Sequence, residues 1–198
     1  MQFLTLFAVG VLIGSAYADA ECFTRRSNEC KKTALSEGAA EFELDICAYQ
    51  KKLFRCLAEA STECGMKFQK SAEKVAETVE NLCSKGTPLN REFNQHKKCL
   101  VKAVSETKCF RPIVESLIAE DKEESRKDAC KQVNNVAECM AKDVARACSR
   151  LTETFFRYIS RPVVDLHKGY CDELVFKNLK RSVHAEMPNF FELWSLAF

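Results

Sequence analysis

The sequence predicts an all-α fold, a disulfide-stapled helical bundle made of two tandem six-cysteine helical halves. Three observations predict it: apolar residues recur at helical spacing, strand-like alternation is not sustained, and twelve cysteines fall into two groups of six. Glycine and proline are sparse and stand mostly where helices are expected to begin or end.

Residues 1–18 have the pattern of a signal peptide. An apolar run from Phe3 to Gly14 precedes a stretch of small residues, and cleavage after Ala18 or after Ala20 fits the pattern. No Lys or Arg precedes the run, which departs from the usual signal. No apolar stretch is long enough to cross a bilayer, so we expect a secreted, extracellular chain without a membrane span.

The cysteines form two sets of six with similar spacing. They are Cys22, Cys30, Cys47, Cys56, Cys64 and Cys83, then Cys99, Cys109, Cys130, Cys139, Cys148 and Cys171. The intervening lengths are 7, 16, 8, 7 and 18 residues, then 9, 20, 8, 8 and 22. This order indicates a tandem duplication, with chance similarity as the alternative. An even number of cysteines in an exported chain predicts a disulfide framework, and the spacing is too wide for a structural zinc site.

The natural seam lies at residues 84–88, where Gly86 and Pro88 interrupt the chain. We therefore expect a first six-cysteine half over 19–86, a second over 87–178 and a C-terminal tail over 179–198. Within each half, 15 pairings are possible, and the sequence does not choose among them. Whether the halves share a core is also left open.

Three apolar stripes predict helices, and in the two longer ones the residues follow at steps of three and four. They are Phe68, Ala72, Val75, Val79 and Leu82; Val133, Val136, Met140, Val144, Ala147, Leu151 and Phe155; and the shorter Ile46, Leu53, Phe54 and Leu57. Cys130 and Cys139 are nine residues apart and so point to opposite sides of a helix. We expect each to bond to a different neighbouring segment.

No catalytic site is evident, and no metal or cofactor is expected. The three histidines stand outside any zinc-protease motif, and His96, next to Lys97 and Lys98, is expected on the surface. Neither a nucleophile elbow nor a phosphate-binding glycine loop occurs. The 30 basic and 28 acidic residues nearly balance, which argues against a nucleic-acid partner.

Two features favour binding. A helical bundle can enclose an apolar pocket, although stripes of this kind more often form a packed core. The tail is rich in aromatic residues and is a candidate contact segment that docks on the body, on a partner or on a membrane surface. Its aromatic residues are Phe190, Phe191, Trp194 and Phe198.

The cysteine number and spacing from Cys22 to Cys171 resemble the twelve-cysteine secreted extracellular domain of nematodes and arthropods, a family without an assigned activity. The chain is also similar in style to cysteine-rich haemolymph glycoproteins of insects, although it has no Asn-x-Ser/Thr sequon. This resemblance implies a helical extracellular domain of arthropod-like type and assigns no function.

The sequence therefore predicts a non-enzymatic extracellular binding protein that carries a small apolar ligand or contacts a protein. A venom or gland-secreted effector is the first alternative. An unrecognised secreted hydrolase is the second.

Overall fold

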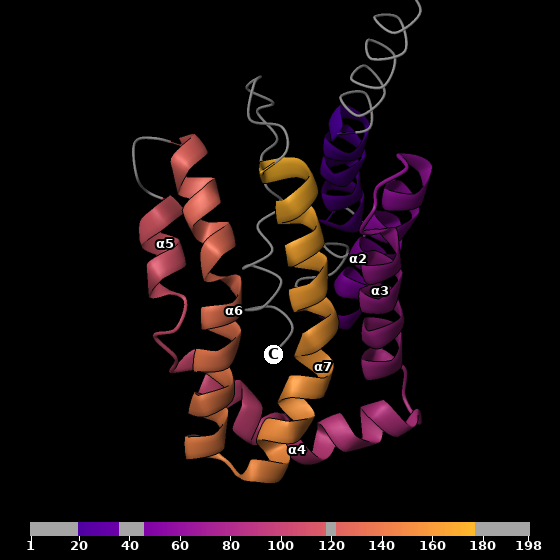
Figure 1. The fold of residues 1–198 in the computed structure, drawn as a ribbon. Helices are drawn as coiled ribbons and strands as arrows, with labels where there is room; N and C mark the ends of the chain where they lie inside the picture. The colour runs from indigo at the N-terminus through magenta and orange to yellow at the C-terminus, as the bar shows by residue number, and fades with distance from the viewer. Residues whose placement is uncertain (1–19, 36–45, 118–121, 177–198) are drawn as a thin grey trace, which may run out of the picture.

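The computed structural model describes residues 20–35, 46–117 and 122–176, and these are all-α (Figure 1). A helix over 20–35 comes first. It is followed by α2 (Ile46–Glu63), α3 (Gln69–Cys83), α4 (Pro88–Ser105), α5 (Arg111–Leu117), α6 (Lys122–Ala147), α7 (Arg150–Tyr170) and the short π-helix η1 (Cys171–Val175). The prediction of a disulfide-stapled helical bundle is confirmed.

The helices form two groups with α7 between them. In Figure 1, α7 stands between α6 on one side and the pair α2 and α3 on the other, while α4 crosses the lower end of the bundle. α5 lies on the outer side of α6. This arrangement puts the second half's last helix in contact with the first half.

The first hydrophobic core is built by the 20–35 helix, α2, α3 and the end of α7. Phe23 and Phe68 meet edge to face with ring centroids 5.1 Å apart, and Tyr170 of α7 lies 6.2 Å from Phe68. Leu166 of α7 is buried in the same cluster. The core of the first half is therefore completed by a helix from the second.

The second hydrophobic core lies among α4, α5, α6 and α7. Its fully buried side chains include Leu100, Ile113, Met140, Val144 and Phe156. Val163 packs against this cluster and against the first one. Since one helix contributes to both cores, α7 links the cores of the two halves.

Turn residues and side-chain caps set where two of these helices begin. Gly86 has φ +86°, a conformation that L side chains rarely adopt, and it precedes Pro88 in the first turn of α4. The Thr87 hydroxyl accepts a hydrogen bond from the Asn90 amide, and the Ser149 hydroxyl accepts one from the Thr152 amide. Both caps satisfy backbone donors that the first helical turn leaves without partners.

All twelve cysteines are paired, and every bridge stays inside one half. The pairs are Cys22–Cys64, Cys30–Cys56 and Cys47–Cys83, then Cys99–Cys148, Cys109–Cys139 and Cys130–Cys171. Numbered in chain order, both halves join the first cysteine to the fifth, the second to the fourth and the third to the sixth. Cys130 and Cys139 bond to different segments, as their helical geometry predicted.

Some sequence expectations were wrong in detail. The long stripe from Val133 to Phe155 does not lie on one helix, because α6 ends at Ala147 and α7 starts at Arg150. Consequently Leu151 is exposed instead of buried. Pro162 stands inside α7 and not at a helix end.

No helix among the described residues is both long and apolar enough to cross a membrane. The proposed signal peptide, residues 1–18, lies outside the described residues, as does the tail over 179–198.

Candidate functional site

An open groove between α4 and α7 is the strongest candidate for a contact site. We call it the α4–α7 groove. It has a volume of about 400 Å³ and is lined by Pro88, Leu89, Glu92, Leu151, Thr154, Phe155 and Tyr158. These residues come from the first turns of α4 and the first two to three turns of α7.

Residues at positions i, i+4 and i+7 of α7 give this groove its apolar character. Phe155 forms the floor and is 3 % exposed, whereas Leu151 and Tyr158 are 68 % and 63 % exposed. Large apolar side chains on a soluble protein are ordinarily scattered singly. Two highly exposed ones around one hollow therefore favour contact with a partner.

The floor of the groove is held from behind by His96 of α4. Its ring stacks on Phe155 with centroids 5.1 Å apart, and its Nδ1 lies 3.0 Å from the Thr152 hydroxyl oxygen. His96 was expected on the surface, and it is instead half-buried, with its ring stacked against α7. The His96 imidazole and the Thr152 hydroxyl are within hydrogen-bonding distance of each other. Thr152 is only 5 % exposed, so its hydroxyl faces the protein interior and not the groove.

Ionic contacts tie α6 to α7 beside the exposed face of α7. Arg157 donates to both carboxylate oxygens of Glu138, at 2.7 and 3.1 Å, and to Glu153 at 2.8 Å. The Glu138 hydrogen bonds raise the pKa of the Arg157 guanidinium above its ordinary value, and those from Arg157 lower the pKa of Glu138. Arg157, Glu138 and Glu153 therefore pair with one another and do not line the groove. The charged side chain in the groove lining is Glu92.

A second open groove lies between α2 and α3, and three of its lining residues are glutamates. It also measures about 400 Å³ and is lined by Arg55, Ala58, Glu59, Thr62, Glu63, Glu73 and Ala76. Glu63 pairs with Arg26 at 3.0 Å, and Arg55 pairs with Glu80 at 3.0 Å. None of the exposed large apolar side chains among the described residues lines it, so this groove is the weaker candidate.

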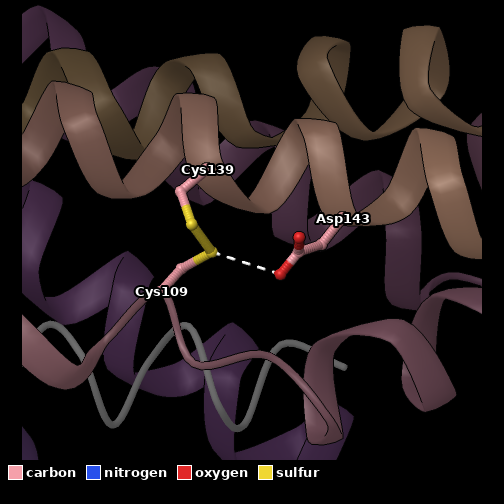
Figure 2. Close-up of side chains that lie close together, drawn as sticks. All are labelled: Cys109, Cys139 and Asp143. Atoms are coloured by element: carbon pink, nitrogen blue, oxygen red, sulfur yellow. Dashed lines mark hydrogen bonds between the residues drawn. A yellow bond between two sulfur atoms is a disulfide. The ribbon is translucent and has the colours of Figure 1, made fainter.

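A third cluster surrounds the Cys109–Cys139 bridge (Figure 2). One oxygen of Asp143 lies 3.3 Å from the Cys109 sulfur and accepts a 2.7 Å hydrogen bond from Thr107, while its other oxygen binds Arg146. A disulfide sulfur carries no hydrogen, so the contact drawn in Figure 2 is a close sulfur–oxygen approach.

This cluster places metal-ligating atom types together in the described part of the chain. The two sulfurs and the carboxylate oxygen lie within 4.8 Å of one another. Metal binding by cysteine requires thiolates, and here the two sulfurs are bonded to each other. With both sulfurs in a bridge, the oxidised protein offers only the carboxylate at this position.

His167 is the most deeply buried histidine among the described residues. It is 2 % exposed, and its Nδ1 lies 2.8 Å from the Val163 carbonyl oxygen. Burial lowers the pKa of His167 to about 4, so its ring is neutral at pH 7. It lies inside α7 and takes no part in the α4–α7 groove.

The structure pairs all the cysteines that the sequence singled out, whereas Phe190, Phe191, Trp194 and Phe198 of the tail lie outside the described residues. Sequence reasoning missed the groove. The long stripe predicts Leu151 and Phe155 as core positions; Phe155 is buried, but Leu151 is exposed, because helical spacing alone does not tell a buried face from an exposed one. The signal that α7 starts afresh is the Ser149 cap.

No family model matches this chain, and neither a curated protein nor a solved structure matches it. The resemblance to the twelve-cysteine extracellular family therefore stays a prediction from cysteine spacing.

Proposed function

We propose that this chain is a secreted, non-enzymatic extracellular binding protein that contacts an apolar segment of a protein partner through the α4–α7 groove. The observation that carries the proposal is the pair of exposed residues, Leu151 and Tyr158, on either side of the buried Phe155. The paired cysteines support an extracellular location, because disulfides persist mainly in oxidising environments.

The open form of the groove favours a protein segment over a small ligand. Small-molecule sites usually bury most of the ligand surface inside a concave pocket. This groove is a hollow between two helices, so a small apolar molecule in it would keep one side in water. A helix or extended segment of a partner can cover the hollow and both exposed side chains together.

Native mass spectrometry of the protein from its natural source tests this proposal. We expect added polypeptide mass that disappears under denaturing conditions. Added mass of a few hundred daltons would instead identify a small-ligand carrier and contradict a protein partner.

Hydrogen exchange locates the contact. In the complex, we expect slower exchange at the start of α4 and over residues 151–158 of α7. Leu151→Glu should weaken the complex at least tenfold, since it places a charge in an apolar contact. The matched control is Val101→Glu, a charge at an exposed valine of α4 that does not line the groove. Protection confined to other elements would overturn the assignment.

A further inference from the structure

We propose that the chain's own C-terminal tail, residues 179–198, occupies the α4–α7 groove until a partner displaces it. The proposal rests on the apolar contact surface assigned in the proposed function and adds its regulation. It starts from the exposure of Leu151 and Tyr158, the two most exposed large apolar side chains among the described residues. Exposed apolar surface of this kind on an unbound protein promotes aggregation.

The end of the tail has the composition that such a groove accepts. Its last nine residues contain six large apolar side chains: Phe190, Phe191, Leu193, Trp194, Leu196 and Phe198. Phe191, Trp194 and Phe198 are spaced i, i+3 and i+7, the pattern by which an amphipathic segment places its apolar face in a groove. The last nine residues carry a single charged side chain, Glu192, so little charge would be desolvated on docking.

The tail is long enough to reach the groove in its own molecule. The described chain ends at Phe176, just after η1, and Phe155 lies 20 residues before Val175. At 1.5 Å per helical residue this separation is about 30 Å. Residues 177–189 can span about 43 Å when extended, at roughly 3.3 Å per residue.

Attachment to α7 favours this occupant over a second copy of the chain. A tether of this length gives the tail an effective concentration of the order of millimolar at the groove, far above that of another molecule in solution. A partner must therefore compete with the tail, and its apparent affinity is reduced by the fraction of molecules in which the groove is covered.

Trp194 is the single tryptophan of the chain, so its fluorescence reports on the tail alone. In the full-length protein we expect emission at shorter wavelength than in the denaturant-unfolded chain. Leu151→Glu should move the emission toward that of the unfolded chain, while Val101→Glu should leave it unchanged. The shift should be independent of protein concentration.

Emission equal to that of the unfolded chain would overturn the proposal, as would emission that Leu151→Glu leaves unchanged. Emission that shifts with protein concentration would show that the tail of a second molecule fills the groove, and this result would also overturn the proposal.

A tail variant separates this inference from the proposed function. Phe198→Glu should release the tail and strengthen partner binding, whereas Leu151→Glu should weaken partner binding. If Phe198→Glu leaves partner affinity unchanged while Leu151→Glu lowers it, the proposed function stands and the tail inference fails. If the Trp194 emission responds to Leu151→Glu but no partner mass is found, the tail does occupy the groove and the proposed partner binding fails.

Discussion

At the scale of single residues, Gly169 marks a close approach between the two halves. It lies in α7 beside Phe68, and a Cβ added at this position would lie 2.5 Å from the Phe68 Cβ. Replacing glycine by alanine inside a helix ordinarily stabilises a protein by about 0.5–1 kcal/mol. Here the neighbouring atom is fixed to the backbone and cannot rotate away.

We therefore expect Gly169→Ala to lower the free energy of unfolding by about 1–3 kcal/mol, the usual range for overpacking. Urea unfolding of the variant measures this. Lys168→Ala, at the exposed neighbouring position, is the matched control and should change stability by less than about 0.5 kcal/mol. A Gly169→Ala protein as stable as the wild type would show that α7 and Phe68 are further apart.

His167 makes stability depend on pH in the mildly acidic range. In the unfolded chain a histidine takes up a proton near pH 6.5, whereas burial lowers the pKa of folded His167 to about 4. Because the unfolded state then binds more protons, stability is full above pH 6.5 and falls as the pH drops towards 4. The slope is at most about 1.4 kcal/mol per pH unit.

Unfolding measured between pH 4 and 7 tests this expectation. His167→Phe should flatten the slope in that range relative to the wild type. Equal slopes for the wild type and His167→Phe would contradict the buried neutral state of His167.

At the scale of elements, α7 decides how the halves depend on each other. Leu166 and Tyr170 of this helix are buried in the first core, and Phe156 is buried in the second. The sequence left open whether the halves share a core, because periodicity identifies an apolar face and not the element that covers it. The structure shows one helix contributing to both clusters.

A chain ending at Gly86 therefore keeps all six cysteines of the first half but loses part of its core. We expect it to form its three bridges and yet bind an apolar dye and unfold over a broad temperature range, since Phe23 and Phe68 lose their cover. The full-length protein under the same conditions is the control. Sharp, cooperative unfolding without dye binding would show that the first half is independent.

Sequence reasoning worked where a physical constraint is local and failed where it is not. The α3 stripe is buried at Phe68, Ala72, Val75 and Val79, as its spacing predicted. The opposite directions of Cys130 and Cys139 followed from helix geometry. The His96–Thr152 contact joins residues 56 positions apart and had no local signal, so the packing of His96 behind the floor of the candidate groove was not predictable.

At the scale of the whole molecule, the two halves carry the same disulfide order. Two unrelated sets of six cysteines paired internally would agree in only about 1 case in 15. Agreement therefore favours duplication of a six-cysteine ancestor as the origin of both halves. Each bridge restricts the unfolded chain and contributes about 2–4 kcal/mol in the usual estimate, so the framework should strongly resist unfolding.

The most direct test of this account is a disulfide map of the oxidised protein, obtained by digestion without reduction and mass spectrometry of the linked peptides. We expect Cys22–Cys64, Cys30–Cys56 and Cys47–Cys83 in the first half, and Cys99–Cys148, Cys109–Cys139 and Cys130–Cys171 in the second. A bridge joining the two halves, or a different order in either half, would contradict both the shared framework and the duplication.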